Sequence, residues 1–201
     1  MSRTKLIIVG ITGASGALYA QRCLQVLVGG GIQTHLVVSP PGQRLLHDEL
    51  GMEGVDLAAL GGTPGDLPGD SPITLHKYRD VGAQLASGSF RHNGMIIIPC
   101  SSNTLSAIAC GSQNNLLHRA AAVTLKEHRP LILVHREMPL GRIDLANMQR
   151  VSEAGAIICP ANPGFYLLPQ TVGDLVDFVV GRVLDLAGVE HELNIRWAGE
   201  G

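Results

Sequence analysis

Charge and aromatic side chains are both scarce in this sequence. Charged residues make up 16% and aromatic residues 3% of its 201 residues, with a single Trp and a net charge of −2. Such a balance does not favour wholesale binding to nucleic acid or to an acidic membrane surface. With so few aromatic rings, the core must be built from Val, Leu, Ile and Ala. Low charge together with 45% hydrophobic residues also favours an oligomer that hides surface from water.

Long hydrophobic runs and paired cysteines are absent as well. No apolar run reaches the roughly 18 residues of a membrane-spanning helix, so no such helix is expected. The apolar run at 5–10 leads into a glycine-rich turn without a cleavage site, so it predicts a strand and no signal peptide. The four cysteines form no CxxC pair and are predicted to be buried free thiols of a reducing, cytoplasmic compartment. The eight histidines show no HxH or HxxxH spacing, so no metal site is predicted.

Apolar runs alternate with helical segments along the chain. This order predicts βαβ units and hence an α/β fold, a three-layer doubly wound parallel sheet of the Rossmann or flavodoxin type. One domain is expected over 1–201, with a tail at 189–201 that can pack on a neighbouring subunit and a mobile Gly/Pro loop at 61–72. Strands are expected at 5–10, 32–38, 94–99, 131–134 and 156–159, and helices at 15–28, 101–110, 116–128 and 171–188, with one more opened by 39–41.

The first strand runs into residues 10–16, GITGASG, which open a helix. Glycines allow close backbone approach, and a helix N-terminus presents free N–H groups to an anion. Because no Lys follows, ATP hydrolysis is disfavoured. An NAD site is disfavoured because the second strand ends in Ser39 where a carboxylate would grip the ribose. The motif suits a mononucleotide such as FMN, and a glycine-rich turn without a ligand is the alternative.

A second polar turn, PCSSNT at 99–104, follows another buried strand. Helix capping is the plain explanation for Ser and Thr here, but three hydroxyls and an amide exceed the needs of one cap. Turns that follow parallel strands meet at one edge of the sheet, where ligands bind. We therefore expect the two turns to form one site.

Charged and aromatic side chains follow the later strands. Arg136 can grip a phosphate or a flavin carbonyl, while Glu137 can move protons; a surface ion pair is the alternative. Tyr166 offers a hydroxyl after the strand at 156–159. Arg182, on the last helix, is by itself best explained as a solvated side chain. Arg119 and Lys126 are seven residues apart and share one helix face.

Eight strings resemble those of the UbiX-type flavin prenyltransferases. They occur in the family's order over nearly the whole chain: GITGASG (10–16), VVSP (37–40), ASGSF (86–90), PCSSNTLSAIACG (99–111), LHRAAAVTLKE (117–127), REMPL (136–140), PGFY (163–166) and VGRVLD (180–185).

The resemblance implies transfer of a dimethylallyl group from dimethylallyl phosphate to N5 and C6 of reduced FMN, without metal. Prenylated FMN would then pass to a UbiD-type decarboxylase, and the enzyme would be a dodecamer. The implied FMN ligands are Gly13, Ala14, Ser15, Ser39, Ser101, Ser102, Asn103, Thr104 and Arg136. The implied substrate ligands, shared in part across a subunit boundary, are Ser87, Arg119, Lys126, Arg136, Tyr166 and Arg182. The implied catalytic groups are Ser15, Glu137, Lys126 and Arg119.

One departure from the pattern and three rival functions remain open. Some family members carry a Trp at the position of Val81, and that Trp would shelter an allyl cation. The nearest rival is an FMN-dependent cysteine decarboxylase, which shares the FMN turn but uses a PASANT-like string in place of PCSSNT. A non-catalytic flavin-binding module is the second rival, and an oligomeric scaffold that binds no flavin is the third.

Overall fold

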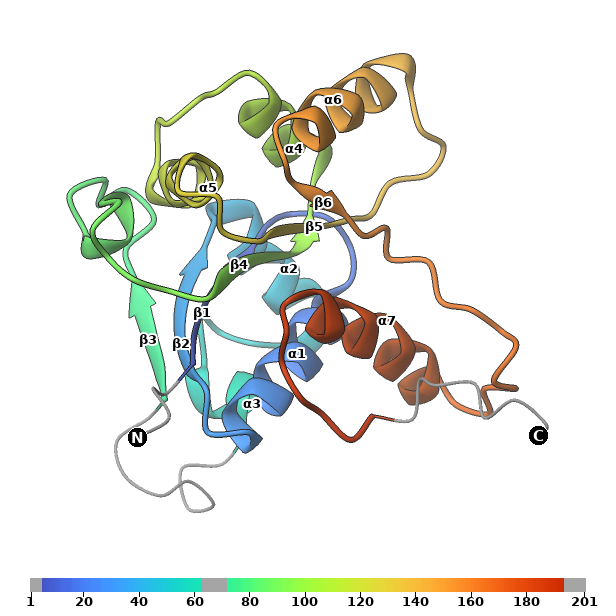
Figure 1. Ribbon diagram of the computed structural model, residues 1–201. Coiled ribbons are helices and arrows are strands. Elements are labelled where there is room, and N and C mark those ends of the chain that lie inside the picture. The colour runs from blue at the N-terminus through green and yellow to red at the C-terminus, as the bar shows by residue number, and fades with distance from the viewer. Residues whose placement is uncertain (1–4, 63–71, 194–201) are drawn as a thin grey trace.

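The chain folds around one six-stranded parallel sheet, shown in Figure 1. The computed structural model describes residues 5–62 and 72–193. The strand order is β3-β2-β1-β4-β5-β6. β2 and β3 therefore extend the sheet on one side of β1, and β4, β5 and β6 extend it on the other side. This confirms the predicted doubly wound fold. The strands are β1 (Leu6–Ile11), β2 (Gln33–Val38), β3 (Ile73–His76), β4 (Gly94–Cys100), β5 (Leu131–His135) and β6 (Ile157–Ile158).

Helices cover both faces of the sheet (Figure 1). One face carries α1 (Ala17–Gly29), α2 (Pro40–Leu50), α3 (Leu57–Gly61) and α7 (Val172–Leu186). The other carries α4 (Ser102–Ala109), α5 (Leu116–Lys126), α6 (Arg142–Glu153) and the short 3-10 helix η2 (Gln84–Ala86). Within the described residues, no helix combines the length and apolar character that crossing a bilayer requires.

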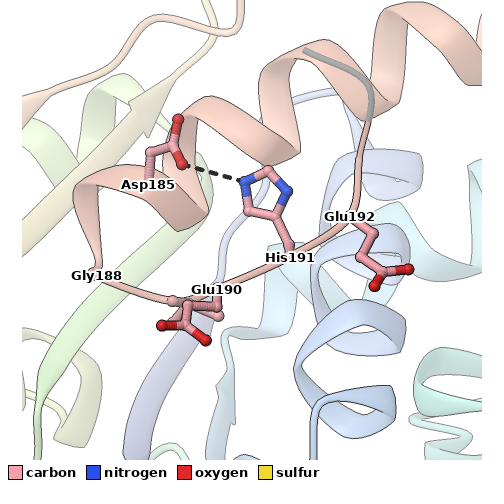
Figure 2. A pocket seen from close by; sticks show the side chains of 6 residues that line it. Asp185, Gly188, Glu190, His191 and Glu192 are labelled. Carbon is pink, nitrogen blue, oxygen red and sulfur yellow. Dashed lines mark ion pairs between the residues drawn. The ribbon is translucent and has the colours of Figure 1, made fainter. Parts of the chain in front are cut away.

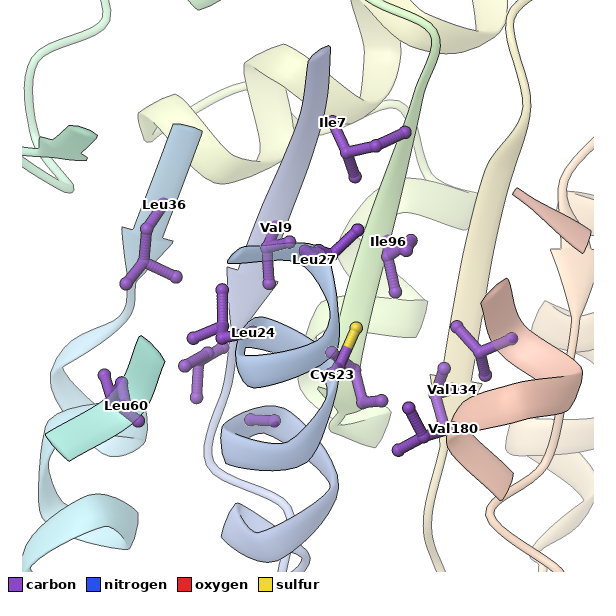
Figure 3. Close-up of a cluster of buried hydrophobic side chains, with 14 of the residues drawn as sticks. Ile7, Val9, Cys23, Leu24, Leu27, Leu36, Leu60, Ile96, Val134 and Val180 are labelled. Atoms are coloured by element: carbon purple, nitrogen blue, oxygen red, sulfur yellow. The ribbon is translucent and has the colours of Figure 1, made fainter. Parts of the chain in front are cut away.

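The sheet alternates its side chains between two apolar cores, as the period of two in a strand requires. Ile7 and Val9 pack with Cys23 and Leu24 of α1 on one face, as Figure 3 shows. Ile8, between them in β1, faces α5 on the other side. Both cores consist almost entirely of aliphatic side chains, as the composition predicts, and burial of β1 and β4 on both faces explains their continuous apolar sequences.

The structure contains elements that the sequence pattern did not reveal. Strand β3 has one buried residue, Ile73, and helix α6 has two, Asn147 and Val151. Neither segment therefore carries a strong apolar periodicity. Residues 63–71 of the expected 61–72 loop lie outside the described residues, while Gly61 belongs to α3.

The sequence also predicted the burial of the cysteines and the packing of the C-terminal tail. Cys110 is exposed and Cys159 is half-buried, so the prediction of four buried thiols is wrong for these two; all four are free. They lie where α4 ends and after the short β6, where coverage is incomplete. In the tail, Val189 joins the core of its own chain and Leu193 packs against it. Residues 194–201 lie outside the described part, so packing of the tail on a neighbour stays a prediction.

Candidate functional site

Thr12 joins the two polar turns at the carboxyl edge of the sheet. Its buried hydroxyl donates to the carbonyl oxygen of Pro99 at 2.7 Å and accepts the N–H of Ser101 at 2.8 Å. The turns after β1 and β4 are therefore held together by one side chain. The expectation that these turns meet is confirmed, and Ser15 and Ser101 both belong to this edge.

Arg136 adds the turn after β5 to the same edge. Its backbone N–H donates to Cys100 O at 3.3 Å, and its guanidinium Nε donates to the carbonyl of Ser15 at 3.2 Å. Three segments far apart in the sequence thus meet around one cation. Ser15 itself is exposed, and Arg136 is half-buried, so both can reach a ligand at this edge.

The N-terminus of α1 is occupied by Glu49, a residue that sequence reasoning missed. The carboxylate of Glu49, at the end of α2, accepts the N–H of Gly16 at 3.0 Å and of Ala17 at 2.8 Å. The expectation that these N–H groups are free for a phosphate is therefore wrong for two of them. The contact nonetheless places an anion, the Glu49 carboxylate, at a helix N-terminus. No local signal could reveal it, because the partners lie 32 and 33 residues apart.

Gly13 has a role within the protein as well as toward a ligand. A Cβ at this position would lie 2.4 Å from Cβ of Pro41, at the start of α2. Only glycine lets the turn pack against that helix. In the same turn Gly13 remains exposed, whereas Ala14 is buried.

Several of the predicted FMN-binding hydroxyls also cap helices. Ser39 accepts the N–H of Gly42 at 3.1 Å and begins α2. Ser101 accepts the N–H of Thr104 at 3.3 Å and donates to its hydroxyl at 3.2 Å, at the start of α4. Helix capping thus accounts for the hydroxyl contacts of Ser39 and Ser101. It also accounts for the contact that Thr104 makes with Ser101. Asn103 is exposed in the same first turn.

Ser102 has a different partner, His135 at the end of β5. The Ser102 hydroxyl lies 3.0 Å from Nε2 of His135, and it also hydrogen-bonds the carboxylate of Asp144 in α6, which lowers the pKa of Asp144. Burial lowers the pKa of His135, so the imidazole is neutral near pH 7. His135 was missed because a lone histidine in an apolar strand carries no motif.

Glu137 is exposed beside this cluster. Its Oε1 accepts the N–H of Met138 at 3.1 Å, and no ion pair of the described residues joins it to Arg136. The surface-pair explanation therefore does not hold within the chain. The neighbouring Met138 is 86% exposed, so this loop is open to a ligand or to a second subunit.

Tyr166 packs against helix α7, and Arg182 is part of that helix. The Tyr166 ring meets Phe178 edge-on, with centroids 5.6 Å apart. Phe178 and Arg182 are four residues apart and therefore share a helix face. Arg182 is also near enough to Cys159, after β6, to lower its thiol pKa against the larger effect of burial, and it pairs with Asp185 at 3.2 Å. Half-exposed Arg182 and Tyr166 are thus grouped.

Ser87, Arg119 and Lys126 form a separate group around helix α5. Arg119 Nε donates to the carbonyl of Ala86 at 3.3 Å, next to exposed Ser87. Lys126 ends α5 just before the chain enters β5, so it lies toward the amino ends of the strands. No hydrogen bond or ion pair of the described residues connects this group with Ser15 or Arg136. Within the described part of the chain, the predicted substrate ligands therefore form three groups: Arg136 beside Ser15, Tyr166 with Arg182, and Ser87 with Arg119 and Lys126.

One cavity lies near Arg182, because Asp185, the ion-pair partner of Arg182, lines it. It has a volume of about 720 Å³ and is lined by Asp185 and residues 188–192, at the end of α7 (Figure 2). The Lys5 side chain, before β1, donates to Gly188 O, which puts this cavity at the amino edge. His191 fills part of it, pairing with Asp185 at 3.3 Å. In the described part of the chain, no three metal-ligating side chains converge there or elsewhere.

Comparison with known proteins assigns the chain to a protein family. The Flavoprotein family model matches residues 1–184. The flavin prenyltransferase UbiX of Halalkalibacterium halodurans is 48% identical over 96% of this chain and 93% of its own length. The chain belongs to the UbiX flavin prenyltransferase family. The mitochondrial flavin prenyltransferase PAD1 of Saccharomyces cerevisiae is 43% identical over 98% of this chain and 77% of its own length.

Solved structures of this family superpose closely. The chain matches AnUbiX, solved in complex with FMN and dimethylallyl pyrophosphate, with a TM-score of 0.87 and 39% identity over 99% of this chain and 100% of that one. It matches a dodecameric FMN-dependent UbiX-like decarboxylase from Escherichia coli O157:H7 with a TM-score of 0.86 and 43% identity over 96% and 100%. The cysteine decarboxylase TvaF, at 12% identity and a TM-score of 0.60, shares the fold alone.

Proposed function

We propose that this flavin prenyltransferase transfers the dimethylallyl group of dimethylallyl phosphate to N5 and C6 of reduced FMN. The prenylated FMN would serve a UbiD-type decarboxylase. Near-full-length similarity to curated flavin prenyltransferases supports the reaction, as does a related structure that holds FMN and an allylic diphosphate. In the structure, the contact between Arg136 and Ser15 carries the proposal, because it places a cation at the turn expected to bind flavin.

The carboxyl edge of the sheet fits a flavin mononucleotide. Its turns present exposed backbone at Gly13 and hydroxyls at Ser15, Ser101 and Ser102, and Arg136 supplies a positive charge. Bound reduced FMN would supply the nucleophilic ring atoms. We assign its binding to the complete set Gly13, Ala14, Ser15, Ser39, Ser101, Ser102, Asn103, Thr104 and Arg136.

Cations are the chain's means of promoting departure of the allylic phosphate. Arg119, Lys126, Arg136 and Arg182, with hydroxyls of Ser87 and Tyr166, would bind the phosphate oxygens and stabilise the charge that develops as the carbon–oxygen bond breaks. Exposed Glu137 and Ser15 are placed at the carboxyl edge, where they would accept and relay the proton that the flavin loses. No step requires a metal.

The division of these ligands within one chain supports a shared site. Among the described residues, no hydrogen bond or ion pair joins the group on α5 to Ser15 or Arg136 in the turns after β1 and β5, so a complete site would take α5 of a second copy. A dodecameric relative, 43% identical, shows that such chains assemble. We infer a homo-oligomer of the same kind. The free, buried Cys23 and Cys100 support a reducing, cytoplasmic location, although the yeast relative is named as mitochondrial.

Anaerobic incubation with reduced FMN and dimethylallyl phosphate tests the reaction. The flavin spectrum should change with time, and the diphosphate, tried in parallel, identifies the preferred donor. A Glu137→Gln variant should bind FMN with unchanged affinity but lose turnover. A protein that binds FMN and leaves both reactants unchanged would be a flavin-binding module, and one that binds no FMN would be a scaffold.

A further inference from the structure

The loop at 86–90, which carries Ser87, is fastened to the end of α5 by Arg129. The Arg129 guanidinium donates through Nη1 to the carbonyl of Phe90 at 2.7 Å and through Nη2 to the carbonyl of Gly88 at 3.0 Å. Its side chain is 17% exposed. A planar fork with two donors fixes both distance and direction, which a single point charge cannot do.

We propose that Arg129 is a positioning residue that holds the 86–90 loop so that Ser87 lies beside Lys126 and Arg119 to receive the allylic phosphate. This inference rests on the proposed function, because it assigns the geometry of the substrate site rather than the reaction. Arg129 itself faces the two carbonyls. It acts on the substrate through the loop.

Close packing shows how tightly the loop lies against the helix. A Cβ at Gly88 would lie 2.4 Å from Oε1 of Glu127 and 3.1 Å from Nζ of Lys126. The backbone between Ser87 and Ser89 therefore passes directly over the Lys126–Glu127 pair, in which Nζ and Oε1 are 3.0 Å apart. Glycine at this position permits that approach, and Arg129 maintains it.

Glu127 links the clamp to the proposed phosphate ligand. Its Oε1 pairs with Lys126, and its Oε2 lies 4.0 Å from Nη2 of Arg129. The Arg129 fork thus binds the loop backbone and also faces the carboxylate that pairs with Lys126. Loss of the fork would release Ser87 and Lys126 together.

The two ends of the loop are restrained independently. At one end Ala86 accepts a hydrogen bond from Arg119. At the other, the Phe90 ring packs edge-on against His35, with centroids 5.1 Å apart, and stacks with His92 at 6.3 Å. The centre of the loop has short-range bonds, from Phe90 N–H to Ser87 O at 3.2 Å and between the Ser87 and Ser89 hydroxyls at 2.8 Å, and Arg129 supplies its bonds to the segment after α5. Its loss should therefore loosen residues 87–89 without unfolding the domain.

Steady-state kinetics on the FMN-loaded oligomer test the clamp. Arg129→Ala should raise KM for dimethylallyl phosphate by about tenfold, with kcat and the FMN dissociation constant within about twofold, because ground-state positioning of the donor is lost. Arg129→Lys keeps one donor group, so its KM should lie between those of the wild type and Arg129→Ala. Millimolar guanidinium should restore KM in Arg129→Ala. Exposed Arg91→Ala, beside the loop, is the matched control and should not change KM.

Gly88→Ala changes the same contact from the loop side. It keeps the inference testable if Arg129→Ala misfolds. Its methyl group should displace the Glu127 carboxylate and, with it, the paired Lys126. KM should therefore rise, and guanidinium should not rescue it. Unchanged KM in both variants would overturn the inference while the proposed function stands. Equal losses of kcat, FMN affinity and thermal stability would also overturn it, because they would show a purely structural arginine. A wild-type enzyme that leaves FMN unalkylated would refute the proposed function, and the inference with it.

Discussion

Arg136 and Ser15 meet through a 3.2 Å hydrogen bond from guanidinium Nε to the backbone carbonyl, although 121 residues separate them in the chain. The bond joins the turn after β5 to the turn after β1 and leaves the two terminal nitrogens of the guanidinium for other acceptors. A flavin bound at this edge would therefore meet a cation whose orientation is set by the protein.

Replacing Arg136 should weaken FMN binding. Arg136→Ala removes a charged hydrogen-bond donor and loosens the Ser15 turn, so we expect the FMN dissociation constant to rise about tenfold or more, a charged hydrogen bond contributing about 1.5–3 kcal/mol. Quenching of flavin fluorescence measures it. Arg142→Ala, an exposed cation on the same segment, is the control. Equal effects of both variants would show a general loss of charge and not a specific contact.

Glu49 should stabilise the N-terminus of α1. Glu49→Gln keeps the shape but removes the negative charge, and we expect the free energy of unfolding to fall by about 0.5–1 kcal/mol at low salt. Chemical denaturation at low and high ionic strength measures the loss, which salt should reduce. Exposed Glu53→Gln, outside any helix, should have no such effect. A salt-independent loss would contradict the dipole explanation.

How far the sequence predicts this fold depends on how its segments are buried. Strands β1, β2 and β4 are buried enough to leave continuous apolar runs, and their expected limits are within about one residue of those observed. β3 at the sheet edge and α6 on the surface bury one and two residues, so they left no such pattern.

In the site, motifs and resemblance pointed to residues at the strand ends, whereas Glu49 and His135 were missed. Glu49 contacts α1 across 32 residues, and His135 contacts Ser102 across 33. Neither relation follows a local period. Only the folded sheet, which brings the carboxyl ends of its strands together, reveals these partners.

The buried histidines should make stability depend on pH. Burial lowers the pKa of His35 to about 4, and nearby His76 and His92 add to the effect; burial also lowers the pKa of His76, His92, His118 and His135. In the unfolded chain these groups titrate near pKa 6.5. Their contribution to stability is therefore complete above about pH 6.5 and is lost as the pH falls below that value, down to about 4 for His35, by up to about 1.4 kcal/mol per pH unit for each group.

Urea denaturation at pH 7.5, 6.0 and 5.0 measures this dependence. His35→Gln retains a polar side chain of similar size but cannot be protonated, so the fall in the free energy of unfolding between pH 7.5 and 5.0 should be shallower than in the wild type. His47→Gln, on the exposed face of α2, is the control and should leave the slope unchanged. A wild-type stability that is flat across this range would contradict the assignment of neutral buried histidines.

Ser102 and His135 should be coupled. Ser102→Ala leaves Nε2 of His135 without its 3.0 Å partner, and an unpaired buried polar atom costs about 1–3 kcal/mol. His135→Leu alone should also destabilise the protein, because Ser102 then loses one of its two partners and keeps only Asp144. The double variant should cost less than the sum of the two. A double-mutant cycle by thermal denaturation measures the coupling, and strict additivity would show that the contact contributes nothing.

The mass of the flavin released after anaerobic turnover with reduced FMN and dimethylallyl phosphate tests the central claim most directly. The proposed reaction predicts a flavin heavier than FMN by one five-carbon prenyl unit from the wild-type protein, and far less of it from Lys126→Ala. Release of FMN with unaltered mass from the wild type, under conditions where FMN binding has been demonstrated, would contradict the account.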